Sequence, residues 1–212
     1  MNQAQIQTEA KFYTFDEFIE WYPENSEFRY ELHDGVIIEM PKPRGKHSLV
    51  TGSLIEKLLI TIREMGFGDI WTIPRESIVK PHRHKSGYEP DIIVLNKETI
   101  VTETRWESES VIHSCTSVKL IVEVVSTNWQ DDYYDKLRDY EGMGIPEYWI
   151  VEHYAALGGR DFIGYPKQPT IFVCELIDGE YVKKMFRGND LIKSPTFLQL
   201  NLTAQQIFDL GE

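Results

Sequence analysis

Two acidic residues stand where a carboxylate is unfavourable unless something neutralises it. Asp91 opens the apolar run Asp91-Ile-Ile-Val-Leu95, and Glu123 lies inside Leu120-Ile-Val-Glu-Val-Val125. Burying an isolated carboxylate is costly, so each needs a cation, a metal or a network of donors. Two interpretations stay open: ion pairs with Lys or Arg, or a shared divalent cation. Two carboxylates and a backbone carbonyl supply the hard oxygen ligands that Mg²⁺ prefers, with waters completing the octahedron.

Two further charged residues could join such a site, although spacing alone promotes neither. Glu31 lies in Arg29-Tyr-Glu-Leu-His33, where a solvated strand residue is the simplest interpretation. Lys136 follows Asp132 by one helical turn. A surface ion pair between those two side chains would be worth only a few tenths of a kcal/mol, and it is the ordinary explanation for a lysine on a helix.

The net charge is acidic, but two short segments are basic. The chain has 22 Lys and Arg against 34 Asp and Glu, a net charge of −12, which opposes a general affinity for nucleic acid at long range. Residues 41–47 and 80–85 nevertheless contain no carboxylate. Their cationic residues are Lys42, Arg44, Lys46, Lys80, Arg83 and Lys85. These segments predict either loops that bind phosphates or loops that only aid solubility.

The histidines and cysteines give no pattern of a zinc site. His82 and His84 are two residues apart, but no third ligand stands nearby. Cys115 and Cys174 lack a C-x-x-C spacing, which disfavours a zinc ribbon or a disulfide framework and predicts two buried thiols. His47 opens a long helix and could contact a phosphate, polarise a water or serve only as a helix residue.

The elements that must position these side chains alternate between strands and helices. Thr14 and Glu17 form a capping box for a short helix to about residue 21, and Asp34-Gly35 predicts a hairpin over residues 28–39. Apolar spacing predicts the longest helix over 48–65. Residues 69–79 indicate a strand interrupted or bent near Pro74, and residues 91–95 a short apolar strand.

The second half of the chain contains the most hydrophobic strand. Residues 118–125 are almost continuously apolar, which predicts a central strand covered on both faces. An amphipathic helix over 131–143 and a buried strand over 147–151 complete a right-handed crossover. A hairpin with strands 171–176 and 181–186 and a helix begun by Thr203 end the chain. The fold class is therefore α/β.

Length and composition favour one domain. A chain of 212 residues with 42% hydrophobic and 26% charged residues suits a single core, so we expect one domain over residues 14–212 and a loose tail over 1–13. No apolar run approaches the roughly 18 residues of a membrane span. The polar start carries no export signal, which predicts a cytoplasmic protein.

Five segments in order carry a resemblance to a known family. They are Tyr30-Glu-Leu-His-Asp-Gly35, Glu89-Pro-Asp91, Ile121-Val-Glu-Val-Val-Ser126, Asp132-x-x-x-Lys136-x-x-x-Tyr140 and Gly144-x-x-Glu147-Tyr-Trp-Ile-Val151. Together they resemble the Uma-type restriction endonuclease family, a branch of the PD-(D/E)XK nuclease superfamily, from about residue 14 to the C-terminus. The resemblance implies a restriction-endonuclease-like core, a mixed central β-sheet flanked by helices, with an N-terminal and a C-terminal hairpin.

The resemblance also implies roles for the acidic residues. Asp91 and Glu123 would hold Mg²⁺ together with the carbonyl of Val124, and Mn²⁺ can substitute for Mg²⁺. The metal would activate a water and neutralise the charge of the transition state. Glu31 would orient that water or bind a second ion.

The lysine of this family sits at a different backbone position. In the general superfamily pattern the lysine comes two residues after the second acid, and here that residue is Val125. The resemblance therefore implies that Lys136, on the following helix, brings its ammonium to the same site. A long, flexible side chain permits this, since the chemistry needs a point charge near the phosphate. Lys136 would position or help to deprotonate the water.

The expected function is metal-dependent hydrolysis of phosphodiester bonds in DNA. The residues expected to bind DNA are Lys42, Arg44, Lys46, His47, Lys80, Arg83 and Lys85. A homodimer would suit an enzyme that cuts both strands. Two alternatives remain open: an inactive nucleic-acid-binding or assembly module on the same fold, and hydrolysis of a phosphoester other than DNA.

Overall fold

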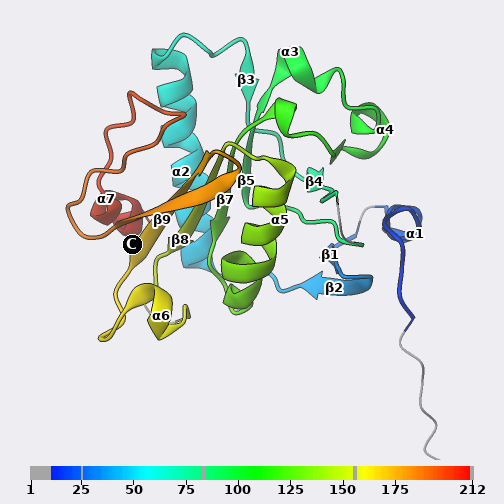
Figure 1. Cartoon of the computed structure of the whole chain (residues 1–212), viewed down its shortest axis with the longest axis horizontal. Helices are drawn as coiled ribbons and strands as arrows, with labels where there is room; N and C mark the ends of the chain where they lie inside the picture. The colour runs from blue at the N-terminus through cyan, green and yellow to red at the C-terminus, as the bar shows by residue number, and fades with distance from the viewer. Residues whose placement is uncertain (1–10, 25, 83–84, 155–156, 211–212) are drawn as a thin grey trace, which may run out of the picture.

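A mixed six-stranded sheet lies at the centre of the molecule (Figure 1). The computed structural model describes residues 11–24, 26–82, 85–154 and 157–210. The strand order is β10-β9-β8-β7-β5-β3, in which β7 and β8 are parallel and all other neighbours antiparallel. The strands are β3 (Trp71–Thr72), β5 (Ile92–Asn96), β7 (Val118–Val124), β8 (Glu147–Glu152), β9 (Thr170–Ile177) and β10 (Glu180–Phe186). The predicted mixed central sheet is confirmed.

Helices cover both faces of this sheet, and short elements fill the connections. The helices of at least six residues are α1 (Phe15–Trp21), α2 (Gly45–Glu64), α5 (Lys136–Met143) and α7 (Ala204–Asp209). The short helical elements are α3 (Lys97–Ile100), α4 (Trp106–Glu109), η1 (Cys115–Ser117), η2 (Asp131–Asp135) and α6 (Arg160–Ile163), and β4 (Ile78–Val79) pairs in parallel with β6 (Val111–Ile112). Figure 1 shows α2 and α5 on opposite sides of the sheet.

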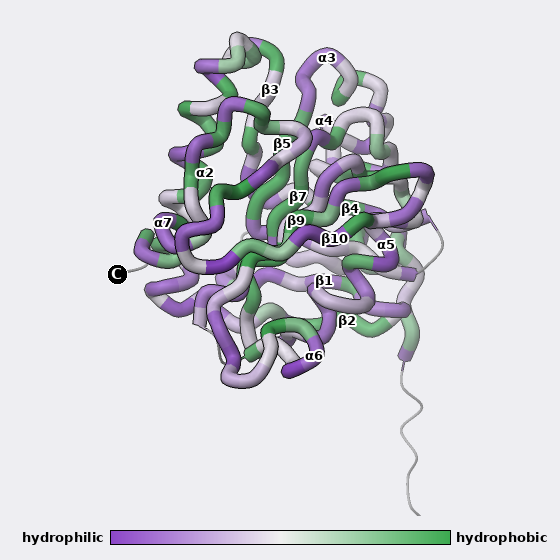
Figure 2. Tube along the Cα trace, turned by 60° about the vertical axis from the view of Figure 1, so that its left-hand side comes forward, coloured by the Kyte–Doolittle hydropathy of each residue, from purple (hydrophilic) through white to green (hydrophobic). Residues whose placement is uncertain are grey.

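β7 is apolar on both faces because each face packs under helices. Val122 and Val124 belong to the core shared with α2 and α7, whereas Ile121 and Val125 belong to the core shared with α5. Figure 2 shows the corresponding apolar colour along β5, β7 and β9. Since side chains alternate along a strand, Glu123 is directed to the α5 side. The most hydrophobic strand therefore carries its carboxylate toward the helix that begins with Lys136.

The N-terminal hairpin forms a separate two-stranded sheet of β1 (Arg29–His33) and β2 (Val36–Met40). Its turn residues Asp34 and Gly35 both have positive φ, 46° and 88°, as the predicted two-residue turn requires. The hairpin is tied to the rest of the molecule by a pair of hydrogen bonds between the backbones of Leu32 and Gly87, 2.9 and 2.8 Å long. This attachment brings β1 alongside the segment that leads into β5.

Several other predictions are confirmed. Thr14 and Thr203 both cap their helices with complete capping boxes, and the C-terminal hairpin turns at Asp178-Gly179. β7, α5 and β8 form the predicted strand-helix-strand unit with parallel strands. Gly144 ends α5 in the left-handed conformation.

Other predictions were wrong in detail. The interruption expected near Pro74 in residues 69–79 is present, but it separates two short strands that lie in different sheets, because Pro74 lacks an N–H and Glu76 turns the chain with a φ of 59°. α2 begins at Gly45 rather than 48, which shortens the first basic loop. The helix over 131–143 starts with a π-helical turn, η2. Cys115 is half-buried, whereas Cys174 is buried as predicted.

Two sequence expectations concern parts that the structure does not fully describe. Most of the predicted tail, residues 1–10, lies outside the described residues, although the N–H of Tyr13 donates to the carbonyl of Gly35 over 2.7 Å. No described helix has both the length and the apolar character needed to cross a membrane.

Candidate active site

Antiparallel pairing of β5 with β7 brings Asp91 and Glu123 together. Ile92 pairs with Val122, so the residue before β5 meets the end of β7. The N–H of Val124 donates to Oδ2 of Asp91 over 2.9 Å, and the N–H of Asp91 approaches Oε2 of Glu123 at 3.4 Å. The Asp91 side chain is 12% exposed, whereas Glu123 is buried. The two predicted metal ligands are therefore neighbours, with one of them accessible.

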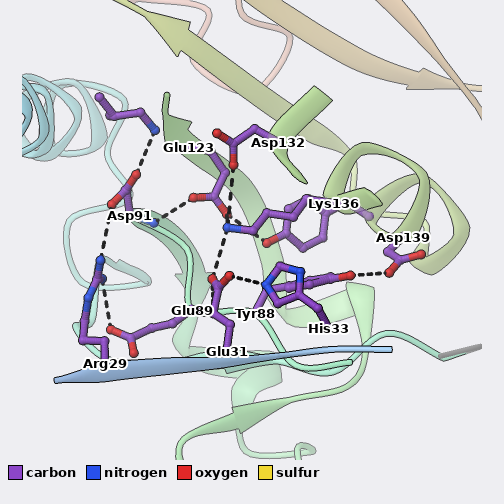
Figure 3. A network of polar contacts seen from close by, with 12 residues as sticks. Arg29, Glu31, His33, Tyr88, Glu89, Asp91, Glu123, Asp132, Lys136 and Asp139 are labelled. Atoms are coloured by element: carbon purple, nitrogen blue, oxygen red, sulfur yellow. Dashed lines mark hydrogen bonds and ion pairs between the residues drawn. The ribbon is translucent and has the colours of Figure 1, made fainter. Parts of the chain in front are cut away.

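Lys136, at the start of α5, contacts Glu123 of this pair. Its Nζ lies 3.1 Å from Oε1 of Glu123, 3.1 Å from Oε1 of Glu31 and 3.7 Å from Oδ1 of Asp132 (Figure 3). The π-helical turn η2 immediately precedes Lys136, and such turns are frequent at functional sites. The structure thus places the predicted lysine against Glu123 and Glu31, although Val125 occupies the usual sequence position.

Glu31 lies inside the protein rather than on a solvated strand. Its Oε1 accepts the N–H of Glu89 over 2.9 Å, and its Oε2 is 2.8 Å from Nε2 of His33. Burial acts to raise the pKa of Glu31, but the ammonium of Lys136 and the His33 ring outweigh it and lower the pKa to about 2. Both oxygens are thus engaged, so the carboxylate is a fixed negative charge that holds Lys136 in place.

The carboxylates outnumber the cations that face them. Burial raises the pKa of Glu123 to about 7; Lys136 acts in the opposite direction, but the charges of Asp91 and Glu31 add to the rise. Burial likewise raises the pKa of Asp132 well above its ordinary value. Lys136 alone does not neutralise this cluster. An added cation would relieve the repulsion, which is the condition expected of a metal site in its metal-free form.

The ligands that the site can offer Mg²⁺ or Mn²⁺ are two carboxylates and one backbone carbonyl. Within residues 11–24, 26–82, 85–154 and 157–210, no group of three or more His, Cys, Asp or Glu side chains is arranged to hold a metal ion. Asp91, Glu123 and the Val124 carbonyl offer oxygen atoms alone, and waters would have to complete the coordination.

Aromatic residues buttress the charged cluster. The hydroxyl of Tyr140 donates to Oε1 of Glu123 over 3.1 Å, and that of Tyr88 donates to Oδ2 of Asp139 over 2.7 Å. Lys136 Nζ lies 5.7 Å from the centroid of the Tyr88 ring. Both tyrosines are buried.

His47 faces the interior of the site. In the first turn of α2, its Nε2 lies 2.9 Å from the Val124 carbonyl oxygen and 3.3 Å from Oδ2 of Asp91. Burial tends to lower the pKa of His47, but Asp91 and the Val124 carbonyl outweigh it and raise the pKa. His47 was expected to bind DNA; the structure places its ring beside Asp91 and the Val124 carbonyl, two of the predicted metal ligands.

A cavity of about 300 Å³ opens above these residues. Asp91, Glu123, Val124, His47 and Lys136 line it together with residues of the 41–44 and 125–128 segments. Lys42 and Arg44 are exposed at this cavity. One predicted basic segment therefore borders the site.

The second basic segment lies elsewhere. Lys80 lines a different cavity of about 330 Å³ with Arg105 and His113, and its ammonium is 4.8 Å from the centroid of the Phe15 ring. Lys85 is exposed but does not line the first cavity. In the first basic segment, Lys46 is half-buried, with its Nζ 5.8 Å from the centroid of the Tyr154 ring. Arg83 and His84 lie outside the described residues.

Sequence reasoning missed Arg29 as a site residue. Its Nη1 is 3.2 Å from Oε1 of Glu89, and its Nη2 is 4.0 Å from Oδ1 of Asp91. Arg29, Glu31 and His33 alternate along β1, and this two-residue period was the available signal for a polar face directed at one site. Figure 3 shows these residues in one network.

The mixed sheet, its two hairpins and its strand-bound carboxylates define a protein of the restriction-endonuclease-like class. A family model described as "Putative restriction endonuclease" (Uma2) matches residues 15–205. The chain belongs to this family, and the predicted family is thereby confirmed.

A solved structure supports the same fold. The chain is similar to the crystal structure of "a putative nuclease belonging to DUF820" from Anabaena variabilis, with a TM-score of 0.69 and 20% sequence identity, over 94% of this chain and 99% of that chain. A comparison with curated proteins found no match.

Proposed function

We propose that this protein is a metal-dependent endonuclease that hydrolyses phosphodiester bonds in DNA. The observation that carries the proposal is the position of the Lys136 ammonium, 3.1 Å from both Glu123 and Glu31, in a cavity that Asp91 also lines. A lysine beside two acids on adjacent strands is the combination that nuclease chemistry of this class requires. Membership of a restriction endonuclease family supports the same conclusion.

Asp91, Glu123 and the Val124 carbonyl would hold Mg²⁺, or Mn²⁺ in its place. Bound there, the cation would supply an activated water and positive charge for the phosphate in the transition state. The fit rests on the buried, acid-rich cluster, in which burial, together with the charges of Asp91 and Glu31, raises the pKa of Glu123 to about 7 despite Lys136.

Lys136 would act as a positive charge rather than as a base. Burial tends to lower its pKa, but Glu123, Glu31 and Asp132 outweigh burial and raise the pKa well above the ordinary value. The ammonium therefore keeps its proton at neutral pH and can offset negative charge on the phosphate. Glu31 becomes a positioning residue, since it holds Lys136 and has no exposed atom at the cavity.

The substrate phosphate has to enter the cavity to reach Asp91, because Glu123 and Lys136 are buried. Lys42 and Arg44 at the same cavity would attract the phosphates on either side and supply local positive charge that the acidic body lacks. A protein that only binds DNA would use those cations without the acids. An enzyme acting on a small phosphoester would use the acids without those cations.

The test is nicking of supercoiled plasmid in Mg²⁺ by the wild type, Asp91→Ala, Lys136→Met and Lys184→Met. Lys184 is a matched control, because it is an exposed lysine paired with Glu175 on the C-terminal hairpin. We expect nicking by the wild type and the control alone, with EDTA abolishing both. Nicking that persists in Asp91→Ala would contradict the proposal. DNA binding without nicking would favour the binding module, and linear product formed with the nicked circle would indicate paired sites in a homodimer.

A further inference from the structure

The His47 ring contacts two of the three groups assigned to the cation, which are Asp91, Glu123 and the Val124 carbonyl. Its Nε2 is within hydrogen-bond distance of the Val124 carbonyl oxygen, 2.9 Å, and close to Oδ2 of Asp91, 3.3 Å. A carbonyl oxygen can only accept, so Nε2 carries the proton that it donates. The N–H is thus directed at the oxygen atoms that a metal ion would need.

Nothing else in the described residues holds the polar edge of this ring. Nδ1 of His47 is buried and has no hydrogen-bond partner there. Arg44, the residue before α2, makes no side-chain cap to the helix that carries His47. The hydrogen bonds of the imidazole therefore go to the candidate ligands alone, and a cation that takes those oxygen atoms releases the ring.

We propose that His47 is a placeholder that occupies Val124 O and Asp91 Oδ2 in the metal-free protein and is displaced when the divalent cation binds. A proton donor and a cation compete for the same lone pairs of the Val124 carbonyl and Asp91 oxygen atoms. The inference rests on the proposed function, because it uses the same cation site. It assigns His47 to the metal site and removes it from the residues that grip DNA.

Removing the N–H of a placeholder should raise the affinity for the cation and lower the stability of the metal-free protein. Removing the N–H takes away a competitor, so the cation binds more tightly. The same change removes the side-chain donor of the Val124 carbonyl oxygen and one of the partners of Asp91, so the metal-free protein becomes less stable. A metal-ligating histidine would instead weaken cation binding when removed.

The experiment is calorimetric titration of the metal-free protein with Mn²⁺, using the wild type, His47→Leu, His47→Gln and His82→Leu. Gln keeps an N–H donor, and His82 is an exposed histidine away from the cavity. We expect His47→Leu to bind Mn²⁺ about tenfold more tightly, the effect of about one lost hydrogen bond. His82→Leu should match the wild type, His47→Gln should lie nearer to it, and metal-free His47→Leu should unfold at a lower temperature.

The results of the titration distinguish a failure of the proposed cation site from a failure of the His47 placeholder. A wild type that binds no Mn²⁺ contradicts the proposed cation site and the placeholder with it. A wild type that binds Mn²⁺ while His47→Leu binds equally or more weakly overturns the placeholder alone. If His47→Leu does not fold, the imidazole ¹H–¹⁵N spectrum of the wild type decides. The Nε2–H signal of His47 must shift on Mg²⁺ binding, and an unchanged signal overturns the placeholder.

Discussion

Replacing Glu123 with Gln should stabilise the metal-free protein while abolishing activity. Glu123 is buried, and burial with the neighbouring carboxylates raises its pKa to about 7 despite Lys136. Compared with an ordinary glutamate pKa of roughly 4.5, the shift corresponds to at most roughly 3 kcal/mol of destabilisation by the charged form. Gln removes the charge, and Glu31 and Asp132 still face Lys136. For a chain of this length, 1 to 3 kcal/mol raises the melting temperature by roughly 2 to 10 °C.

The pH dependence of the melting temperature tests separately whether the charge on Glu123 destabilises the folded protein. Because the folded-state pKa of Glu123 is raised, its penalty is fully present above about pH 7 and disappears as the pH falls toward the unfolded value. Melting temperatures of both proteins in EDTA should therefore differ most at pH 8 and converge near pH 5.

Glu103→Gln serves as the matched control. Glu103 is a buried glutamate whose two oxygens accept the backbone N–H groups of His113 and Ser114, so its replacement should destabilise the protein. A Glu123→Gln variant that is less stable than the wild type at pH 8 would refute the reasoning, since it would make Glu123 a structural ion-pair partner.

Four further predictions concern the supports of the site. Lys136→Met should cost about 3 to 5 kcal/mol in urea unfolding, because it leaves three carboxylates without their cation. Glu31, with its pKa lowered to about 2, contributes stability above pH 4.5 that is lost as the pH falls toward 2, and Glu31→Gln should flatten that part of the stability profile. Gly87→Ala should destabilise the protein by about 1 to 3 kcal/mol in urea unfolding, because its Cβ would lie 2.7 Å from Cε2 of Phe15. Replacing both Lys42 and Arg44 with Gln should reduce the salt slope of DNA binding by about 2, measured by fluorescence anisotropy, without altering Mn²⁺ titration.

Several turns, helix ends and strands of the fold could be predicted because their signals lie in neighbouring residues. The Asp34-Gly35 turn, the capping box at Thr14 and the apolar run that became β7 all carry their signals within a few residues. The interruption of residues 69–79 near Pro74 could be predicted, but the placement of the two pieces in different sheets could not. Which sheet a two-residue strand joins is decided by distant partners, here Asn96 for β3 and Val111 for β4.

The candidate site shows the same contrast. Asp91 and Glu123 were visible because a carboxylate in an apolar run demands a partner. Lys136 came only from the family resemblance, since helix spacing equally predicts a surface pair with Asp132. The burial of Glu31 and the inward position of His47 arise from docking of the hairpin and of α2 on the sheet, which no local pattern encodes.

The central claim is that Asp91, Glu123 and the Val124 carbonyl hold the metal of a nuclease. The most direct measurement is a crystal structure of the protein in Mn²⁺, with the metal located by its anomalous scattering. We expect one manganese bonded to oxygen atoms of these three residues, with Lys136 beside it, and this result would support the assignment. A crystal in which these residues hold no metal, or in which manganese binds other residues instead, would contradict it.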